Sequence, residues 1–238
     1  MRLSQVILWR PKAAAALAAA AALMVVAPAL ADKPQTVLTG PTPTTIAAVP
    51  IDFDRDHPSR TEFGKLIFRG GLNLYARSPY FGGYSALAID PSGQALLAIS
   101  DAGTWLRAKV DYDGRHIKGL SGGVLGPILG ADGQPLRDDA MRDSEGMTLV
   151  DGDTRQGAAY VSFERRHRIA RYPFTAGRFG PPTGTVTLPA GTKGMSANRG
   201  IEAITIIRSG KLKGTLVALP EGLTDKNGNL RGDRKSVV

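Results

Sequence analysis

Short apolar runs alternate with turn-forming residues through the middle of the chain. Between residues 143 and 172, three such runs (GMTLV, AAYVSF and RIARY) are separated by an Asp-Gly-Asp cluster and by the charged corner ERRHR. Runs of about five residues bounded by turn residues are typical of successive antiparallel strands. No amphipathic helical pattern follows residue 31. The pattern therefore predicts an all-β fold.

The same unit occurs three times along the chain. SALAI at 85–89 matches EGMTL at 145–149 and EAITI at 202–206, at spacings of 60 and 57 residues. The second predicted strand of each unit is followed at once by an acid, namely Asp101, Glu164 and Glu221. A repeat the size of a small sheet is typical of β-propeller blades. We therefore predict a partial β-propeller of about three four-stranded blades plus an N-terminal strand.

The N-terminal residues 1–31 have the pattern of a cleaved secretory signal peptide. Basic residues precede an alanine-rich apolar stretch, and an Ala-x-Ala site at 29–31 stands before Asp32. The chain contains no cysteine, which excludes disulfides, a lipid anchor on cysteine and zinc held by thiolates. We therefore expect a periplasmic or secreted protein with no membrane span after signal removal.

Composition divides the rest of the chain into three parts. Residues 32–60 are rich in Pro, Thr and Asp and predict an extended segment. Residues 61–232 carry the repeats and form the predicted, incomplete propeller domain, in which 117–142 are expected to be a long connection with one short strand. Residues 233–238 (DRKSVV) end the chain without a further strand pattern, and we expect them to be a non-native tail.

The charge of the chain bears on its partners. The formal net charge is +9, and the expected signal peptide accounts for three of the positive charges. A basic protein suits an anionic small-molecule substrate, although the charge also serves solubility alone. Nucleic-acid binding is not expected, because no aromatic and basic platform accompanies the charge. We expect a monomer.

Several segments, taken in order, carry a resemblance to a known family. They are FGGYSALAIDPSGQALLAISDAGTWLRAKVDYDG, ADGQPLR, DSEGM, YVSFERRHRIARYPF, NRGIEAI and ALPEG, which span most of residues 62–222. With these segments the chain resembles the bacterial "esterase-like activity of phytase" family. The resemblance implies a β-propeller distantly similar to calcium-dependent alkaline phytases, and hydrolysis of phosphomonoesters such as phytate. Compared with a full-length member, the chain is expected to be truncated at its C-terminus.

The repeat places five acids at equivalent strand ends: Asp101, Glu145, Glu164, Glu202 and Glu221. If the inner strands line one axis, these carboxylates converge, and like charges packed together need cations. Carboxylate oxygens suit calcium, which could polarise a phosphoryl oxygen and activate a water molecule. We predict all five as metal ligands and Glu145 and Glu202 as catalytic residues. Arg165, Arg168 and Arg199 lie beside the acids in sequence and are predicted to bind the substrate phosphate.

Two alternatives remain open at this point. Each acid could instead pair with its neighbouring arginine and hold the sheets together, which would leave a non-catalytic propeller that binds a ligand or partner. Ser85 lies in a Gly-Tyr-Ser sequence that faintly resembles a nucleophile elbow, but the second glycine and the helix of that motif are missing. A serine hydrolase is therefore the weaker hypothesis.

Overall fold

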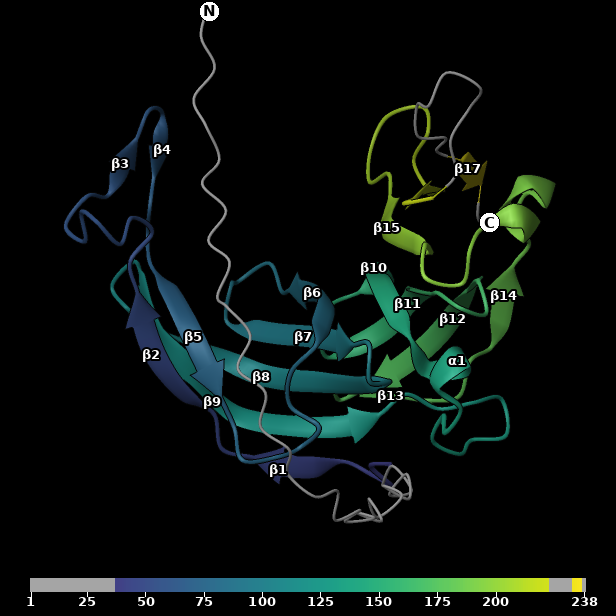
Figure 1. The fold of residues 1–238 in the computed structure, drawn as a ribbon, viewed down its shortest axis with the longest axis horizontal. Helices are drawn as coiled ribbons and strands as arrows, with labels where there is room; N and C mark the ends of the chain where they lie inside the picture. Colours follow the sequence, from purple (N-terminus) through teal and green to yellow (C-terminus); the bar gives the residue numbers. More distant parts are fainter. Residues whose placement is uncertain (1–36, 223–232, 237–238) are drawn as a thin grey trace, which may run out of the picture. The chain divides into compact units, whose positions relative to one another are not determined.

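The computed structural model describes residues 37–222 and 233–236, and its secondary structure is almost entirely β (Figure 1). Among these residues the helices are one turn of α-helix, α1 (Asp139–Arg142), and a 3-10 turn, η1 (Ala190–Gly194). The all-β prediction is confirmed. The expected signal peptide, residues 1–31, lies outside the described residues.

Three antiparallel sheets follow one another along the chain. The first has the order β1-β9-β8-β7-β6, with β1 (Thr42–Thr44), β6 (Tyr84–Ile89), β7 (Ala95–Ser100), β8 (Thr104–Asp113) and β9 (His116–Pro127). The second contains β10 (Ser144–Gly152), β11 (Gln156–Phe163) and β12 (Arg168–Thr175), with the short β13 (Arg178–Phe179) and β14 (Gly184–Val186) both paired to β12. The third contains β15 (Ile201–Ile206), β16 (Thr215–Pro220) and β17 (Asp233–Ser236).

Two smaller strand pairs lie between β1 and β6 along the chain. β2 (Ala47–Ile51) pairs with β5 (Gly71–Tyr75), and β3 (Glu62–Phe63) pairs with β4 (Leu66–Ile67). The segment 32–60, which was expected to be extended, therefore contains two paired strands. One is β2, and the other is β1, which forms the outer edge of the first sheet. At the other end of the chain, residues 233–236 pair with β16. Their non-native origin stays a prediction.

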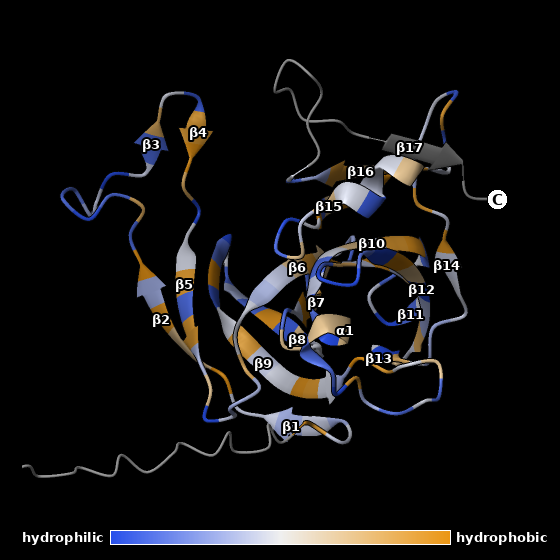
Figure 2. Ribbon diagram, turned by 45° about the vertical axis from the view of Figure 1, so that its right-hand side comes forward, coloured by the Kyte–Doolittle hydropathy of each residue, from blue (hydrophilic) through white to orange (hydrophobic). Residues whose placement is uncertain are grey.

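The expectation for residues 117–142 is wrong in one respect. Most of its first half belongs to β9, a strand of 12 residues that pairs with β8 along its whole length. Glycines concealed this strand in the sequence, because glycine lowers strand propensity. They allow close approach here: a Cβ at Gly126 would lie 2.1 Å from the ring of Trp105, and one at Gly123 would lie 2.7 Å from the carbonyl oxygen of Thr44. Figure 2 shows hydrophobic bands along this strand.

Hydrophobic side chains fill the spaces between consecutive sheets. Leu97, Ile99 and Trp105 of the first sheet pack with residues of the second, among them Val161 and Tyr172. A second cluster joins the other face of the second sheet to the third; it includes Tyr160, Ile169, Ile204, Ile206 and Leu216. The first strand of the second sheet, β10, consequently lies between β6 and β15.

The predicted repeat is present in the register of the backbone. The strands β6, β10 and β15, which we call the first strands of the three repeats, each have an irregularity at the second residue, so that Ser85, Glu145 and Glu202 each lie in a β-bulge. A bulge inserts an unpaired residue and redirects its side chain. The three sheets therefore present the same backbone device at the same end of their first strands.

Candidate functional site

The backbone places the acids that follow the second strands in the same way in all three sheets. The N–H of Asp101 donates to the carbonyl oxygen of Gly83 at 3.0 Å, and the N–H of Glu221 donates to that of Gly200 at 3.0 Å. In the second sheet the N–H of Glu164 donates to the carbonyl oxygen of Asp143 at 2.9 Å. The equivalence inferred from the sequence spacing therefore holds at the level of single hydrogen bonds.

Three carboxylates converge at the end of the second sheet. Asp143, Glu145 and Glu164 each offer an oxygen atom, and these atoms lie within 4.8 Å of one another. We call these three residues the acidic triad. The hydroxyl of Ser144 anchors this end of β10 by donating to the carbonyl oxygen of Ser100, at the end of β7, at 2.7 Å. Asp143 itself is only 8% exposed.

The electrostatics of the triad oppose full ionisation. The pKa of Glu145 is raised to about 8, mainly by burial and then by the negative charges of Glu202 and Asp143. Burial is also the main cause of the raised pKa of Glu164, followed by the charge of Asp143. Closely spaced carboxylates in a partly buried place stabilise one another's protonated forms unless a cation offsets the charge. The triad is therefore short of positive charge.

Glu202 extends the acidic group toward the third sheet. Its pKa is raised by burial and then by the charge of Glu221, while a hydrogen bond from the N–H of Gly200, at 3.2 Å, acts in the opposite direction. The charge of Glu202 in turn raises the pKa of Glu145. Four of the five predicted acids are thus electrostatically linked along the second and third sheets.

Asp101, the fifth predicted acid, does not belong to the triad. It is exposed, and its carboxylate accepts a hydrogen bond from the hydroxyl of Ser100 at 3.3 Å. It lies over Gly83, where a Cβ would come within 2.1 Å of its Oδ1 atom. Glu221 is exposed as well. The structure therefore brings Glu145 and Glu164 together and leaves Asp101 and Glu221 at the periphery.

Asp143 is the member of the triad that the sequence reasoning missed. Its equivalents in the other two sheets are Gly83 and Gly200, so the repeat gave no reason to expect a side chain there. The glycine at 200 leaves room for the neighbouring sheet, because a Cβ would lie 2.4 Å from the Cβ of Glu164. The available signal was the position of Asp143 in the segment DSEGM, directly before the bulge.

Arg165 is the arginine that contacts the triad. Its Nε atom donates to Oδ2 of Asp143 at 2.5 Å, and this hydrogen bond is the main cause of its raised pKa. The backbone φ angle of Arg165 is 54°, which is uncommon for a residue other than glycine. Its backbone N–H donates to the carbonyl oxygen of Ala197 at 2.9 Å, which links this turn to the segment before β15.

The other two predicted phosphate-binding arginines lie differently. The guanidinium group of Arg168 donates to the carbonyl oxygens of Met141 and Arg166 and lies 3.7 Å above the ring of Phe163. These contacts hold the Arg168 side chain at the end of the second sheet. Arg199 is exposed, and its Cβ lies 2.7 Å from where a Cβ of Gly222 would be.

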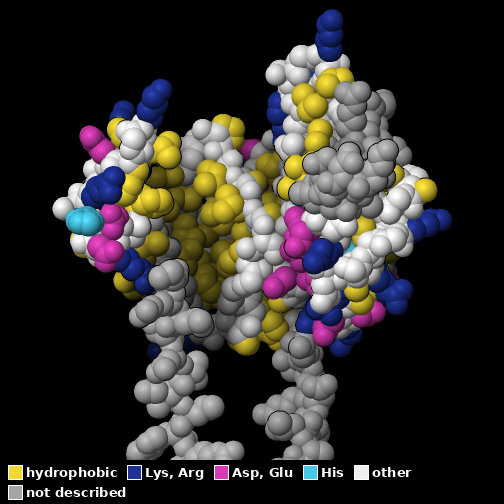
Figure 3. All heavy atoms as spheres, turned by 45° about the horizontal axis from the view of Figure 1, so that its top comes forward, with side chains coloured by type: hydrophobic (Ala, Val, Ile, Leu, Met, Phe, Trp, Pro, Cys, Tyr) yellow, Lys and Arg dark blue, Asp and Glu magenta, His cyan; other side chains and the backbone are white. Residues whose placement is uncertain are grey.

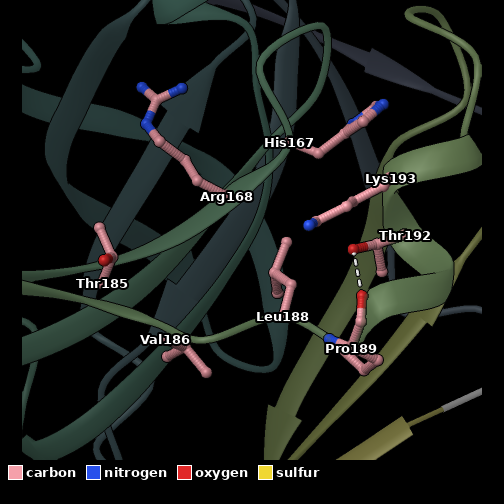
Figure 4. Close-up of a pocket in the computed structure, with 8 residues that line it drawn as sticks. All are labelled: His167, Arg168, Thr185, Val186, Leu188, Pro189, Thr192 and Lys193. Atoms are coloured by element: carbon pink, nitrogen blue, oxygen red, sulfur yellow. Dashed lines mark hydrogen bonds between the residues drawn. The ribbon is translucent and has the colours of Figure 1, made fainter.

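A cavity of about 430 Å³ adjoins the corner that carries Glu164 and Arg165. It is lined by His167, Arg168, Thr185, Val186, Leu188, Pro189, Thr192 and Lys193. In Figure 4 the side chain of Lys193 extends between His167 and Leu188, whereas that of Arg168 is directed away from them. His167 contacts the carbonyl oxygen of Ser196 through Nε2 at 3.1 Å.

Comparison with known proteins adds a family to this geometry. A family model described as "Esterase-like activity of phytase", a phytase-like family, matches residues 79–237, which is more than half of the chain. The chain belongs to this family. The matched region begins just before β6, so it contains the three large sheets apart from the edge strand β1, and β1 to β5 precede it. No curated protein matches the chain.

The acidic triad consists of hard oxygen donors with too little positive charge around them, and such a donor set fits a divalent cation such as calcium. A cluster of acidic residues that could bind a metal ion is therefore present. Within the part of the chain that the structure describes, no helix has the length and apolarity needed to cross a membrane.

Proposed function

We propose that this member of the phytase-like family is an exported phosphoric-ester hydrolase that acts, with the help of calcium, on an anionic phosphomonoester such as phytate. The acidic triad carries the proposal, because three carboxylates within 4.8 Å, one of them with its pKa raised to about 8, need a cation to be ionised together. Membership of the phytase-like family supports hydrolysis as the reaction.

The fold supports the architecture that belongs to this proposal. Three antiparallel sheets lie in succession, and the first strand of the middle sheet lies between the first strands of its neighbours. We propose that these sheets are blades of a partial β-propeller spanning residues 61–232, after a signal peptide at 1–31 and an extended segment at 32–60. Acids at equivalent strand ends then lie around one axis.

The residues divide into distinct roles. Asp143, Glu145 and Glu164 would hold the calcium ion, which when bound supplies a Lewis acid for a phosphoryl oxygen and lowers the pKa of a coordinated water. Glu202 lies outside the triad with a raised pKa, which suits a general base that accepts a proton from the attacking water. The negative charges of Glu221 and Asp143 contribute to that raised pKa, after burial.

Arg165 orients the phosphate in this scheme. Its Nε atom is bound to Asp143, so the two terminal nitrogen atoms of the guanidinium group are the donors left for a phosphate oxygen. Arg199 is exposed and can add a second positive charge. The contacts of Arg168 with Phe163 and with the Met141 carbonyl support a structural role for that residue instead.

A phosphate-release assay tests the proposal. The purified chain is incubated with phytate in calcium and, in parallel, in excess EDTA, and inorganic phosphate is measured. We expect release only with calcium, and a loss of about 100-fold in the Glu202→Gln variant, because a general base contributes about 10²–10⁴-fold. Phosphate release that persists unchanged in EDTA would contradict the role of the ion.

The Asp143–Arg165 ion pair favours a second candidate function, a non-catalytic propeller that binds an anionic ligand. In that case the acids and Arg165 maintain the structure of the corner, and the ligand is held without turnover. Calorimetric titration with phytate separates the two functions. Binding in calcium without phosphate release supports the second one.

A further inference from the structure

The junction between the first and second sheets contains another cavity, of about 340 Å³, away from the acidic triad. It is lined by residues of β7, β8 and β9 and by the turn between β10 and β11. The triad lies at the start of β10 and this turn follows its end, so a strand of 9 residues, each advancing about 3.3 Å, separates the two places. Both sheets of this junction are described, so the cavity does not belong to an open end of the series of sheets.

Two cations of β8 reach the cavity because strand alternation places them on the covered face of the first sheet. Arg107 lies opposite Leu97 of β7, which packs in the core between the first and second sheets. Lys109 is two residues further along β8 and therefore on the same face. Trp105, two residues before Arg107, belongs to that core. The face that begins in the core thus ends in two cations that line the cavity.

The second sheet holds Arg107 across the junction. Its Nη1 atom donates to the carbonyl oxygen of Ala176, in the turn between β12 and β13, at 2.5 Å. Gly177 makes room for this side chain, because a Cβ there would lie 2.4 Å from Cδ of Arg107. The N–H of Gly177 donates to the carbonyl oxygen of Arg155 at 2.7 Å and so links this turn to a third cation of the cavity. Arg107 uses one nitrogen for these contacts and keeps other donors for a ligand.

A buried hydroxyl group completes the lining. Thr154 is 1% exposed, and its Oγ1 atom has no hydrogen-bond partner among the residues that the structure describes. Asp153 shapes the turn around it by accepting from the N–H groups of Arg155 and Gln156 at 2.6 Å and 3.2 Å. Leaving a buried hydroxyl unpaired is unfavourable, so such a group indicates that something else binds beside it.

Positive charge is concentrated at this cavity. On the face shown in Figure 3, Asp and Glu side chains lie beside Lys and Arg side chains, so that opposite charges offset one another. The lining of the cavity contains three cations, Arg107, Lys109 and Arg155, and no acid. Within the described part of the chain, none of the three takes part in an ion pair. We call these three residues and Thr154 the basic cavity.

Asp90 is an acid close enough to the basic cavity to interact with it. Its pKa is lowered, mainly by the hydrogen bond from Ser92, and the positive charge of Arg155 contributes. Its carboxylate accepts from the hydroxyl of Ser92 at 2.6 Å and from the N–H groups of Gln94 and Ala95 at 2.8 Å and 2.9 Å. These bonds hold the carboxylate in the turn before β7, and the three cations keep an excess of positive charge.

The cavity has room for more than a free ion. Its volume corresponds to roughly ten water molecules, at about 30 Å³ each in the liquid. Part of its wall is uncharged and small, namely Ala95, Ala108 and Gly122. Gly122 lies in a bulge, where two residues of β9 oppose Ala108 of β8, and a Cβ there would meet no atom within 4 Å. A small organic group therefore fits beside an anion.

We propose that the basic cavity binds the phosphate group of a small phosphorylated molecule, with its three cations holding the phosphate oxygens and the hydroxyl of Thr154 donating to one of them. Guanidinium donors match phosphate oxygens in pairs, and Lys109 supplies a further positive charge. A phosphate monoester carries a charge of about −1.5 to −2 at pH 7, which suits the excess of cations. This site depends on neither the acidic triad nor calcium, so it goes beyond the hydrolysis proposed above.

Isothermal titration calorimetry of the full chain with glycerol 3-phosphate, in EDTA, provides the first test. We expect binding, and a loss of affinity of about tenfold or more in Lys109→Gln and in Arg155→Gln, because each removes a charge-assisted hydrogen bond. Lys118→Gln is the matched control and should change the affinity by less than about twofold, since Lys118 is exposed on β9 outside the lining. Equal losses in all three variants would reveal a dependence on net charge alone and would refute the site.

Other anions define the chemical class of the ligand. Inorganic phosphate should compete with glycerol 3-phosphate but bind more weakly, because it leaves the uncharged part of the wall without contacts. Phosphate that binds as tightly would contradict the organic part of the ligand and assign the site to the free ion. Acetate that competes as well as phosphate, or glycerol 3-phosphate that does not bind at millimolar concentration, would overturn the proposal.

Thr154→Val tests the hydroxyl group separately. Valine leaves no buried hydroxyl without a partner, so the midpoint of thermal unfolding without ligand should not fall. The affinity should fall by about fivefold or more, whereas Thr154→Ser should keep it within about twofold. Wild-type affinity in Thr154→Val would mean that the hydroxyl faces a bound water instead, contrary to its role as a donor. Lys109 and Arg155 are exposed, so their variants test the site even where a change at Thr154 lowers stability.

Glu145→Gln separates this inference from the proposed hydrolysis. It should bind glycerol 3-phosphate like the wild type, since Glu145 lies at the other end of β10. Lys109→Gln should still release phosphate from phytate in calcium. Loss of glycerol 3-phosphate binding in Glu145→Gln, together with unchanged binding in Arg155→Gln, would place the phosphate group at the acidic triad and leave the basic cavity without a ligand.

Discussion

The first and second sheets share a backbone design and differ in the chemistry placed on it. Both begin with a bulge and both close it with a hydrogen bond from the acid after the second strand. In the second sheet the positions carry Asp143, Glu145 and Glu164, whereas in the first they carry Gly83, Ser85 and Asp101. Among the residues that the structure describes, only the second sheet gathers a triad of carboxylates. The repeat thus supplies the positions, and single substitutions between copies decide which of these positions carry clustered carboxylates.

The largest expected effect separates the two bulges directly. Glu145→Gln should lower kcat/KM for phosphate release by about 100-fold, because it removes a ligand and a charge from the proposed ion site. Ser85→Ala, at the equivalent bulge of the first sheet, should change it by less than about twofold. Kinetics with phytate in calcium measure both. Equal losses in the two variants would show that the first sheet takes part in the chemistry.

The second prediction concerns the corner of the second sheet. Arg168→Ala should lower the free energy of unfolding by about 2 kcal/mol, because it removes the contact with the Phe163 ring and the hydrogen bond to Met141. Arg199→Ala, at an exposed position, should change it by less than about 0.5 kcal/mol. Urea denaturation gives both values. A loss of activity in Arg168→Ala without a loss of stability would restore Arg168 to the substrate site.

The third prediction uses the raised pKa of Glu145. Without a cation, the folded chain holds this proton up to about pH 8, whereas the unfolded chain releases it near its ordinary value. Between these values the folded state binds more protons, so stability is complete at low pH and falls as the pH rises. We expect a loss of about 1–2 kcal/mol from pH 5 to pH 8, well below the full linkage value because the carboxyl group is partly exposed to solvent.

Urea denaturation in EDTA at several pH values measures this slope. Glu145→Gln should flatten it, since the glutamine side chain does not titrate. Saturating calcium should raise stability most at the higher pH, because the ion binds the deprotonated triad. A slope that is identical in the wild type and in Glu145→Gln would contradict the assigned cause.

The smallest expected effect is at the periphery of the site. Asp101→Asn should change the calcium affinity by less than about twofold, because Asp101 is exposed and lies outside the triad. Glu164→Gln, at the equivalent position of the second sheet, should reduce that affinity by about tenfold or more. Isothermal titration calorimetry compares the two variants. A similar loss in both would mean that the first sheet belongs to the ion site after all.

Much of the fold was accessible from local pattern alone. Short apolar runs bounded by turn residues predicted the strands of the second sheet, and the spacing of the repeat predicted which residues are equivalent. The length of β9 was underestimated as one short strand because its glycines, which make room for Trp105 and Thr44, resemble a loop when read along the chain. Strand propensity does not record what approaches a residue from another strand.

The candidate site was predictable only in part, because local pattern determines where strands end but not which side chains meet there. The sequence by itself determined that Glu145 and Glu164 stand at the ends of neighbouring antiparallel strands, because strand pairing follows from hydrophobic period and chain reversal. Only the tertiary structure decided that Asp143 joins them and that Arg165 rather than Arg168 contacts the group. It also decided that Leu87 is exposed while Met147 is buried. Side-chain direction at a bulge or corner, and the covering of a face by another sheet, depend on contacts between residues that are distant along the chain.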